Sequence, residues 1–291
     1  MRCKRAWAAT AVRCWGTEST LYANAVELGH QGRFGYNSRM TLYDHYAQAY
    51  DDSGQIAFSL RMIPYLDQLL QRHPVQGRSM LDLACGTGTV AMSYAQQGWE
   101  VYAVDASAGM LDQARRKAKE SGLDLSFSQQ DMRHFVLPHR VALVTCLYDS
   151  LNYMLTEQDL GKAFAQVSGA LLPGGLFLGD MNTQVTLEEV WGNNTFFVDR
   201  EGMSLILRSG YETETRLSTV HIVGFMKRPE GTYERFDEHH TEIAYEADQV
   251  QAALHEAGLG VEAAYECFLL SEPDSRSRRV MWVARKPEIS Q

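Results

Sequence analysis

A glycine turn between an apolar stretch and a helix-forming stretch constrains this chain most. The run Met80-Leu-Asp-Leu-Ala-Cys-Gly-Thr-Gly-Thr-Val-Ala91 predicts a strand that breaks at Gly86 and Gly88 and opens a helix. Glycine has no Cβ and reaches left-handed backbone angles, so a ligand can approach the main-chain N–H groups of such a turn. The spacing of Gly86, Gly88 and Ala91 also satisfies a dinucleotide-binding fingerprint, so the residues around the turn must decide between ligands.

From Met40 onward, short apolar runs alternate with helical patterns, which is typical of βα units around a parallel sheet. We expect strands near residues 79–84, 101–104, 125–128, 142–147 and 175–179, with helices between them. Residues 182–245 instead alternate as antiparallel strands do, and the chain then returns through a helix and a strand pair near residues 261–269 and 279–285. We therefore predict an α/β fold with N-terminal lid helices at 40–75, a core at 76–181 and 246–289, and an antiparallel β insertion at 182–245 that covers the strand ends.

Composition excludes several classes of protein. With 291 residues, 45% of them hydrophobic, the chain can bury a core, and its net charge of −9 disfavours nucleic acid as a partner. Five cysteines without metal-ligand spacing indicate a reducing, cytoplasmic setting and no metal site. No apolar run reaches the roughly 20 residues that span a bilayer, so we expect no membrane partner. Residues 1–39 are expected to be a disordered leader, with Met40 as an alternative start.

Three acidic residues lie at or near the ends of three successive predicted strands. Asp105, after the second strand, stands where a carboxylate binds ribose hydroxyls. Asp82 stands beside the glycine turn, where it opposes a pyrophosphate and favours a cation such as a sulfonium, although an Asp here can also simply cap the turn. Asp131 can accept the exocyclic amine of adenine, and Met132 and Met110 can pack against the ring.

The ordered set Asp82-Leu-Ala-Cys-Gly-Thr-Gly88, Val104-Asp-Ala-Ser-Ala-Gly-Met110, Asp131-Met132, Cys146-Leu-Tyr-Asp-Ser-Leu-Asn152 and Leu172-Pro-Gly-Gly175 resembles the class I S-adenosylmethionine-dependent methyltransferases, in particular the sugar-amine and glycine N-methyltransferases. The resemblance implies a Rossmann-like, seven-stranded, mostly parallel sheet of strand order 3-2-1-4-5-7-6. It also implies that Gly86 and Gly88 line the methionine moiety, Asp105 the ribose, and Asp131 with Met132 the adenine. The full set of expected cofactor-binding residues is Arg61, Asp82, Ala84, Gly86, Gly88, Asp105, Ala106, Met110, Asp131, Met132 and Cys146.

The acceptor site is expected where the fourth strand ends and where the lid and the insertion meet it. Tyr43, Tyr46 and Tyr50 follow helical spacing, so one aromatic stripe can face a sulfonium, or it can simply pack in the core. Asp149 lies at the carboxyl edge of the sheet, where its alternative role is turn formation. Of the adjacent His239 and His240, only one can face the pocket. We take Tyr50, Asp149 and His240 as the candidate catalytic residues.

These observations predict an enzyme that transfers a methyl group from S-adenosylmethionine to the nitrogen or oxygen of a small molecule. The alternatives are a tRNA or protein methyltransferase, a nicotinamide-dependent oxidoreductase suggested by the glycine spacing, and a non-catalytic cofactor-binding module. The sequence does not identify the methyl acceptor, and it leaves open whether the protein forms a homodimer.

Overall fold

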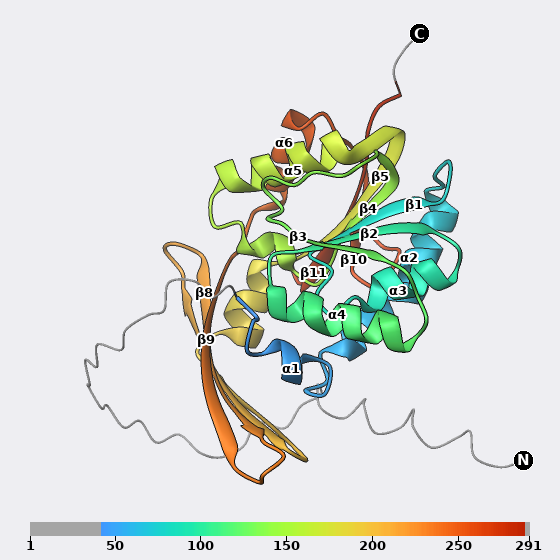
Figure 1. Ribbon diagram of the computed structural model, residues 1–291. Coiled ribbons are helices and arrows are strands. Elements are labelled where there is room, and N and C mark those ends of the chain that lie inside the picture. The colour runs from blue at the N-terminus through green and yellow to red at the C-terminus, as the bar shows by residue number, and fades with distance from the viewer. Residues whose placement is uncertain (1–41, 289–291) are drawn as a thin grey trace, which may run out of the picture. The chain divides into compact units, whose positions relative to one another are not determined.

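The computed structural model describes residues 42–288, which form two β-sheets with flanking helices (Figure 1). The expected leader at residues 1–39 lies outside the described residues. The larger sheet contains, in spatial order, β3 (Ser126–Gln129), β2 (Glu100–Asp105), β1 (Ser79–Leu83), β4 (Val141–Cys146), β5 (Leu171–Asn182), β11 (Arg279–Arg285) and β10 (Gly260–Glu266). Counted within this sheet alone, β10 and β11 are the sixth and seventh strands, so the order is 3-2-1-4-5-7-6. β11 runs antiparallel to both of its neighbours, β5 and β10, and the other pairs of strands in this sheet are parallel.

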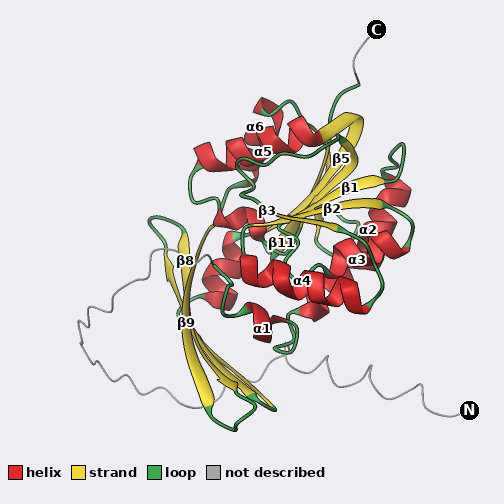
Figure 2. Ribbon diagram, viewed as in Figure 1, coloured by secondary structure: helices red, strands yellow, loops and turns green. Residues whose placement is uncertain are grey.

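Helices cover both faces of this sheet (Figure 2). One face packs against α5 (Glu157–Ala170) and α6 (Ala247–Glu256), and the other against α2 (Ile56–Arg72), α3 (Thr89–Gln96) and α4 (Ala108–Glu120). Because successive side chains of a strand point to opposite faces, Leu81 packs with the α5 cluster while Met80 packs with α2 and α3. Because both faces of the central strands are buried, these strands consist of nearly continuous runs of apolar residues.

Two helices begin at residues whose side chains cap them. Ser107 and Thr156 precede α4 and α5, and their side chains accept hydrogen bonds from the N–H groups of Met110 and Asp159. Such caps satisfy main-chain donors that a first helical turn leaves unpaired. The turns after β2 and before α5 are thereby positioned locally, by residues close in sequence.

The second sheet is fully antiparallel and is called the cover sheet here. It consists of β6 (Thr195–Arg200), β7 (Met203–Glu212), β8 (Leu217–Lys227) and β9 (Tyr233–Ile243), in that order, and it follows a short helical segment at Thr186–Trp191. One face buries Leu205, Ile222 and Phe236 against Tyr46. The cover sheet therefore has its own small core, completed by the N-terminal segment.

That N-terminal segment, residues 42–55, is called the lid here. Its helical part, α1, spans only Ala47–Tyr50, since Tyr43 has a left-handed φ of 69° and the residues between form turns. The lid is thus less helical than its tyrosine spacing predicts. The rings of Tyr43, Tyr46 and Tyr50 still contact one another, with centroids 5.6–6.2 Å apart.

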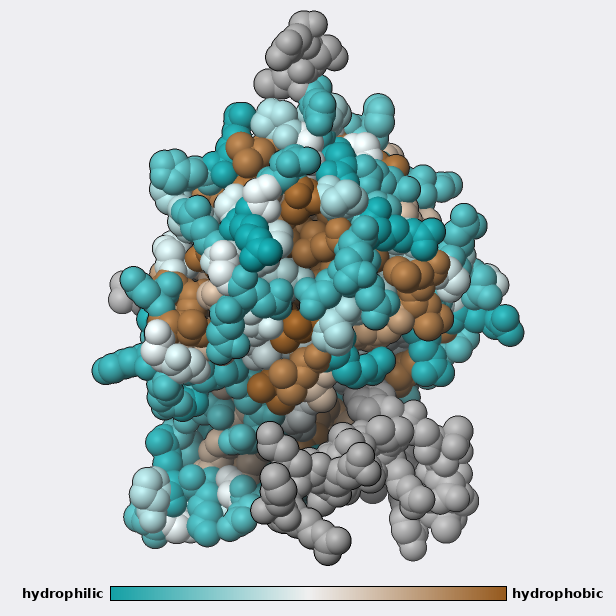
Figure 3. Space-filling model, turned by 90° about the vertical axis from the view of Figure 1, so that its right-hand side faces the viewer, coloured by the Kyte–Doolittle hydropathy of each residue, from teal (hydrophilic) through white to brown (hydrophobic). Residues whose placement is uncertain are grey.

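On the face shown in Figure 3, hydrophobic residues are interspersed with hydrophilic ones. Within residues 42–288, no helix is long and apolar enough to cross a membrane.

Candidate active site

A cavity of about 480 Å³ lies at the carboxyl ends of the first four strands of the large sheet, with the lid along one side. Ligands of open α/β sheets bind at this edge. The cavity wall is built mainly from lid residues 42–43 and 50 and from residues at the carboxyl ends of four strands. These are 82–87 at the end of β1 and beyond it, 105–107 at the end of β2 and beyond it, 130–133 after β3, and 147–148, 150 and 153–154 after β4.

The glycine turn forms the floor of the cavity beside β1. Gly86 and Gly88 have φ values of +54° and +76°, and this left-handed backbone explains why glycine occupies both positions. A Cβ on Gly86 would meet no atom within 4 Å, whereas one on Gly88 would lie 3.0 Å from Cβ of Ala114. Gly86 therefore keeps space open at the cavity, while Gly88 lets α3 pack closely against α4 and does not line the cavity.

Three main-chain donors of this turn are paired within the protein. The N–H of Gly86 donates to Asp105 (2.8 Å), that of Gly88 to the carbonyl of Cys85 (2.9 Å), and that of Ala91 to Asp82 (3.1 Å). A dinucleotide site needs such N–H groups free for the pyrophosphate. These three N–H groups are therefore not free for a pyrophosphate, which argues against the oxidoreductase alternative.

Asp82 is buried at the bottom of the cavity, with 2% of its surface exposed. Its carboxyl group accepts hydrogen bonds from Thr145 (2.8 Å) and from the N–H of Ala91, so it does brace the turn. Burial nevertheless raises the pKa of Asp82 to about 7. A cation in the cavity would stabilise the ionised form, because the charges attract in a poorly solvated site.

Other expected cofactor residues line the same wall. Asp105 accepts hydrogen bonds from the N–H groups of Gly86 and Ser107, both at 2.8 Å, and burial raises its pKa. Asp131 is held by Arg133, whose hydrogen bond lowers the pKa of that carboxyl group.

The wall also contains Ala84, Ala106, Met110 and Met132. The lining has three aspartates but one basic residue, Arg133, which is paired with Asp131 and Asp159. Such a site fits a cationic adenosine compound better than a polyphosphate.

Two further expected cofactor residues lie away from the cavity. Arg61 stacks over the ring of Phe268, 4.2 Å from its centroid. Cys146 is completely buried and packs among the residues that face α5. For both residues, and for Gly88, a direct cofactor contact stays a prediction.

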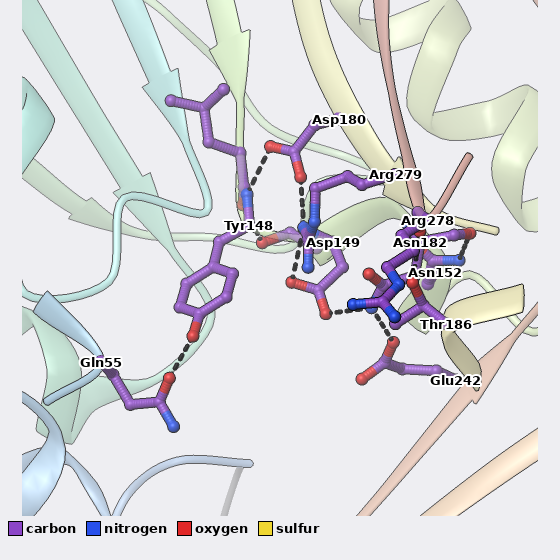
Figure 4. Close-up of polar contacts among 12 residues, drawn as sticks. Gln55, Tyr148, Asp149, Asn152, Asp180, Asn182, Thr186, Glu242, Arg278 and Arg279 are labelled. Atoms are coloured by element: carbon purple, nitrogen blue, oxygen red, sulfur yellow. Dashed lines mark hydrogen bonds and ion pairs between the residues drawn. The ribbon is translucent and has the colours of Figure 1, made fainter. Parts of the chain in front are cut away.

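Asp149 belongs to a buried polar cluster behind the cavity wall (Figure 4). It accepts hydrogen bonds from Arg279 (3.2 Å) and Asn182 (2.6 Å), and Asn182 also donates to Glu242 (3.1 Å). Arg279 forms a second ion pair with Asp180. Because Asp149 points into this cluster and does not line the cavity, its catalytic role stays a prediction.

The cluster supports an unusual turn. Tyr148 and Asp149 have left-handed φ values of 59° and 55°, which for non-glycine residues cost roughly 1–3 kcal/mol each. Asp180 accepts the N–H groups of both residues, at 2.7 and 3.2 Å. Asp180 and Arg279 were not expected from the sequence, although Asp180 stands near the end of an apolar strand, as Asp105 does. Their effect is to hold the Tyr148 ring against the cavity.

Four tyrosines, Tyr43, Tyr50, Tyr148 and Tyr153, line the cavity. Tyr148 stacks on Phe58 with a centroid distance of 4.1 Å, and its hydroxyl group donates to Gln55, as Figure 4 shows. Burial raises the pKa of each of the four phenols, so they act as neutral hydrogen-bonding groups. Tyr153 was not singled out in the sequence, and His240 lies behind it without lining the cavity.

The lid is fastened to the cofactor side of the cavity by its own carboxylates. Asp51 accepts hydrogen bonds from Lys117 (2.6 Å) and from Thr87 of the glycine turn (2.7 Å). Asp44 accepts one from Ser107 at the start of α4 (2.8 Å). The lid therefore bridges the turn after β1 and the turn after β2.

Known proteins share both this fold and this sequence pattern. A methyltransferase-domain family model matches residues 80–175. A putative methyltransferase of Bacillus subtilis (strain 168), YqeM, is 31% identical over 246 residues, which cover 84% of this chain and 97% of that protein. The dTDP-3-amino-3,6-dideoxy-alpha-D-glucopyranose N,N-dimethyltransferase of Streptomyces fradiae is 27% identical over 68% of this chain and 76% of its own length.

A solved structure extends the match to three dimensions. The crystal structure of an S-adenosylmethionine-dependent methyltransferase from Clostridium acetobutylicum ATCC 824 has a TM-score of 0.74 and 27% identity, and the match covers 84% of this chain and 99% of that one. The strand order, the acidic cavity, the paired N–H groups of the glycine turn and these matches all indicate the same family. The chain belongs to the class I S-adenosylmethionine-dependent methyltransferases, and S-adenosylmethionine is its methyl donor.

Proposed function

We propose that this methyltransferase acts on the amine nitrogen of a small molecule. The observation that carries the proposal is the tyrosine wall formed by Tyr43, Tyr50, Tyr148 and Tyr153. Aromatic faces attract cations, and neutral phenols offer hydrogen bonds to an amine. S-adenosylmethionine, when bound, supplies an electrophilic methyl group on a cationic sulfur. The protein must then align the amine lone pair with that methyl group and exclude water.

The cofactor would occupy the acidic end of the same cavity. We assign the ribose to Asp105, the adenine to Asp131, Met132 and Met110, and the cationic centre to the region of Asp82 and Ala84. Gly86 fits this assignment because the space where its Cβ would stand is open. Asp82 fits because a nearby cation offsets the burial that raises its pKa.

A small acceptor suits the size and charge of the site. A cavity of about 480 Å³ is within the usual range for small-ligand sites, and here the cofactor shares it with the acceptor. The net charge of −9 does not suit a nucleic acid. An amine is also the acceptor in the printed name of the Streptomyces fradiae relative, which supports nitrogen over oxygen.

Matched acceptor pairs test this proposal. The purified protein is incubated with S-adenosylmethionine and amino sugars, nucleotide-linked amino sugars and simple amines, each beside the analogue with a hydroxyl in place of the amine. S-adenosylhomocysteine is then quantified. We expect turnover with an amine and none with its hydroxyl analogue, and Asp105→Ala as the control should abolish it. Turnover confined to hydroxyl compounds, or to bulk tRNA or protein, would contradict the proposal.

A further inference from the structure

A continuous line of hydrogen-bonding side chains leads from the acceptor end of the cavity into the cover sheet. The hydroxyl groups of Tyr43 and Tyr153 lie 2.7 Å apart, and both residues line the cavity. The Tyr153 hydroxyl lies 3.1 Å from Nδ1 of His240, and Nε2 of His240 lies 3.2 Å from Oε2 of Glu238. His240 and Glu238 are only 4% and 8% exposed, so little solvent reaches the inner end of the line.

Glu238 sets the direction of this line. Its carboxyl oxygens accept three main-chain N–H groups of the lid, from Tyr43 (3.1 Å), His45 (2.8 Å) and Tyr46 (2.9 Å). A carboxylate only accepts hydrogen bonds, so Nε2 of His240 must carry the hydrogen that faces it. In a neutral imidazole the other nitrogen, Nδ1, is then an acceptor.

The remaining donors follow from that assignment. Tyr153 must donate its hydroxyl hydrogen to Nδ1 of His240, and its oxygen must accept the hydroxyl hydrogen of Tyr43. The Tyr43 oxygen is left with lone pairs for a group in the cavity. Every hydrogen in the line therefore points from the cavity toward Glu238.

We propose that Tyr43, Tyr153, His240 and Glu238 form a proton relay that removes the acceptor's proton during methyl transfer. This inference rests on the proposed amine acceptor. The amine lone pair forms the new bond to the methyl carbon, and the carbon–sulfur bond breaks with its electron pair going to sulfur. One N–H bond then breaks, and its electron pair stays on nitrogen as the new lone pair. The proton passes to the Tyr43 oxygen while the Tyr43 proton moves to Tyr153 and the Tyr153 proton moves to Nδ1 of His240. Both phenols end neutral, and the imidazolium is paired with the Glu238 carboxylate.

Tyr43 is the catalytic residue of this relay, because it takes the proton from the acceptor, and Tyr153 and His240 act through it. The lid completes the relay, since Tyr43 belongs to the lid and its main chain is held by Glu238. Tyr43 also has a left-handed φ of 69°, and its ring lies against that of His240, tilted by 59° with the centroids 4.5 Å apart. A bulky residue holds such a backbone angle only where its surroundings compensate the strain. The carboxylate that compensates here is the one that ends the relay.

The tautomer of His240 tests the relay without any acceptor. The protein is produced with isotope-labelled histidine and saturated with S-adenosylhomocysteine, and NMR at neutral pH reports which ring nitrogen carries hydrogen. His240→Gln identifies the signal among those of the nine histidines. We expect hydrogen on Nε2 alone. Tyr153→Phe, which keeps the ring and loses the donor, should shift the Nδ1 resonance and leave Nε2 protonated, whereas Tyr50→Phe should shift neither. Hydrogen on Nδ1, or on both nitrogens, overturns the relay.

Turnover gives a second, separable measurement with whichever amine the acceptor panel yields. Tyr153→Phe and His240→Gln should each lower kcat about 100-fold, a typical contribution of proton transfer, with the affinity for S-adenosylhomocysteine unchanged. The double variant should be no slower than the single ones, because either change interrupts the same relay. Multiplicative losses, or an unchanged kcat, would overturn the relay. If no amine is turned over while the tautomer is as expected, the proposed acceptor fails and the hydrogen direction stands.

Discussion

Replacing Asp82 with asparagine tests how the cavity selects a cation. Burial raises the pKa of Asp82 from 3.8 to about 7, although two hydrogen bonds to the carboxyl group oppose this. The folded protein therefore keeps this proton at pH values where the unfolded chain has released it. The stability that Asp82 contributes is complete below pH 3.8 and is lost as the pH rises through about 7.

The size of the effect follows from the two pKa values. Between pH 5 and pH 8, linkage predicts that Asp82 lowers the free energy of unfolding by about 2.5 kcal/mol. Asp82→Asn should lack this loss, because asparagine has no titrating proton. It keeps the shape of aspartate, can accept the N–H of Ala91, and can donate to the Thr145 hydroxyl, which accepts as well as donates.

Urea unfolding of the two ligand-free proteins at pH 5, 6, 7 and 8 measures this difference. The wild-type protein should lose stability relative to Asp82→Asn, mostly between pH 5 and 7. Calorimetry then measures the binding of the two ligands. The preference of the wild-type protein for S-adenosylmethionine over neutral S-adenosylhomocysteine should grow between pH 6 and 8 and stay constant in Asp82→Asn. Parallel stability curves, together with the same preference in both proteins at both pH values, would refute the reasoning.

Three further substitutions separate cofactor binding, packing and lid closure. Asp105→Ala should abolish measurable affinity for S-adenosylmethionine by calorimetry, because it removes the proposed ribose ligand and frees the Gly86 N–H; wild-type affinity would exclude this assignment. Gly88→Ala should lower the free energy of unfolding by about 1–3 kcal/mol, because the new Cβ meets Cβ of Ala114 at 3.0 Å and the φ of residue 88 is left-handed. Urea unfolding measures this loss, and an unchanged unfolding midpoint would show that α3 and α4 can move apart. Asp51→Asn should weaken the bond from Lys117 and speed proteolytic cleavage within the lid, a result that identical cleavage rates would contradict.

Much of the fold could be predicted from local patterns. The strands before Asp105 and Asp149, the caps at Ser107 and Thr156, and the change to antiparallel pattern after residue 182 all depend on residues close in sequence. The lid is the exception. Its tyrosine spacing predicts a helix, but contacts of its main chain with Glu238, nearly 200 positions away, hold it in turns. Tertiary hydrogen bonds override such a short helical pattern, because one or two turns are marginally stable alone.

The sequence by itself determined the glycine turn, the acidic residue at or near the end of each of three strands, and the strand order implied by the family resemblance. The tertiary structure decided which side chains reach the cavity. Four expected site residues lie next to residues that line it without lining it themselves: Gly88, Cys146, Asp149 and His240. The space beside Gly88 is filled by Ala114, Cys146 packs in the core, and Asp149 and His240 form buried hydrogen bonds. The physical reason is that a motif specifies local backbone geometry, whereas access to a cavity depends on which distant segments fill the remaining space. The pairing of Tyr43 and Tyr153 with His240 of the cover sheet arises only when the lid, the turn after β4 and β9 meet.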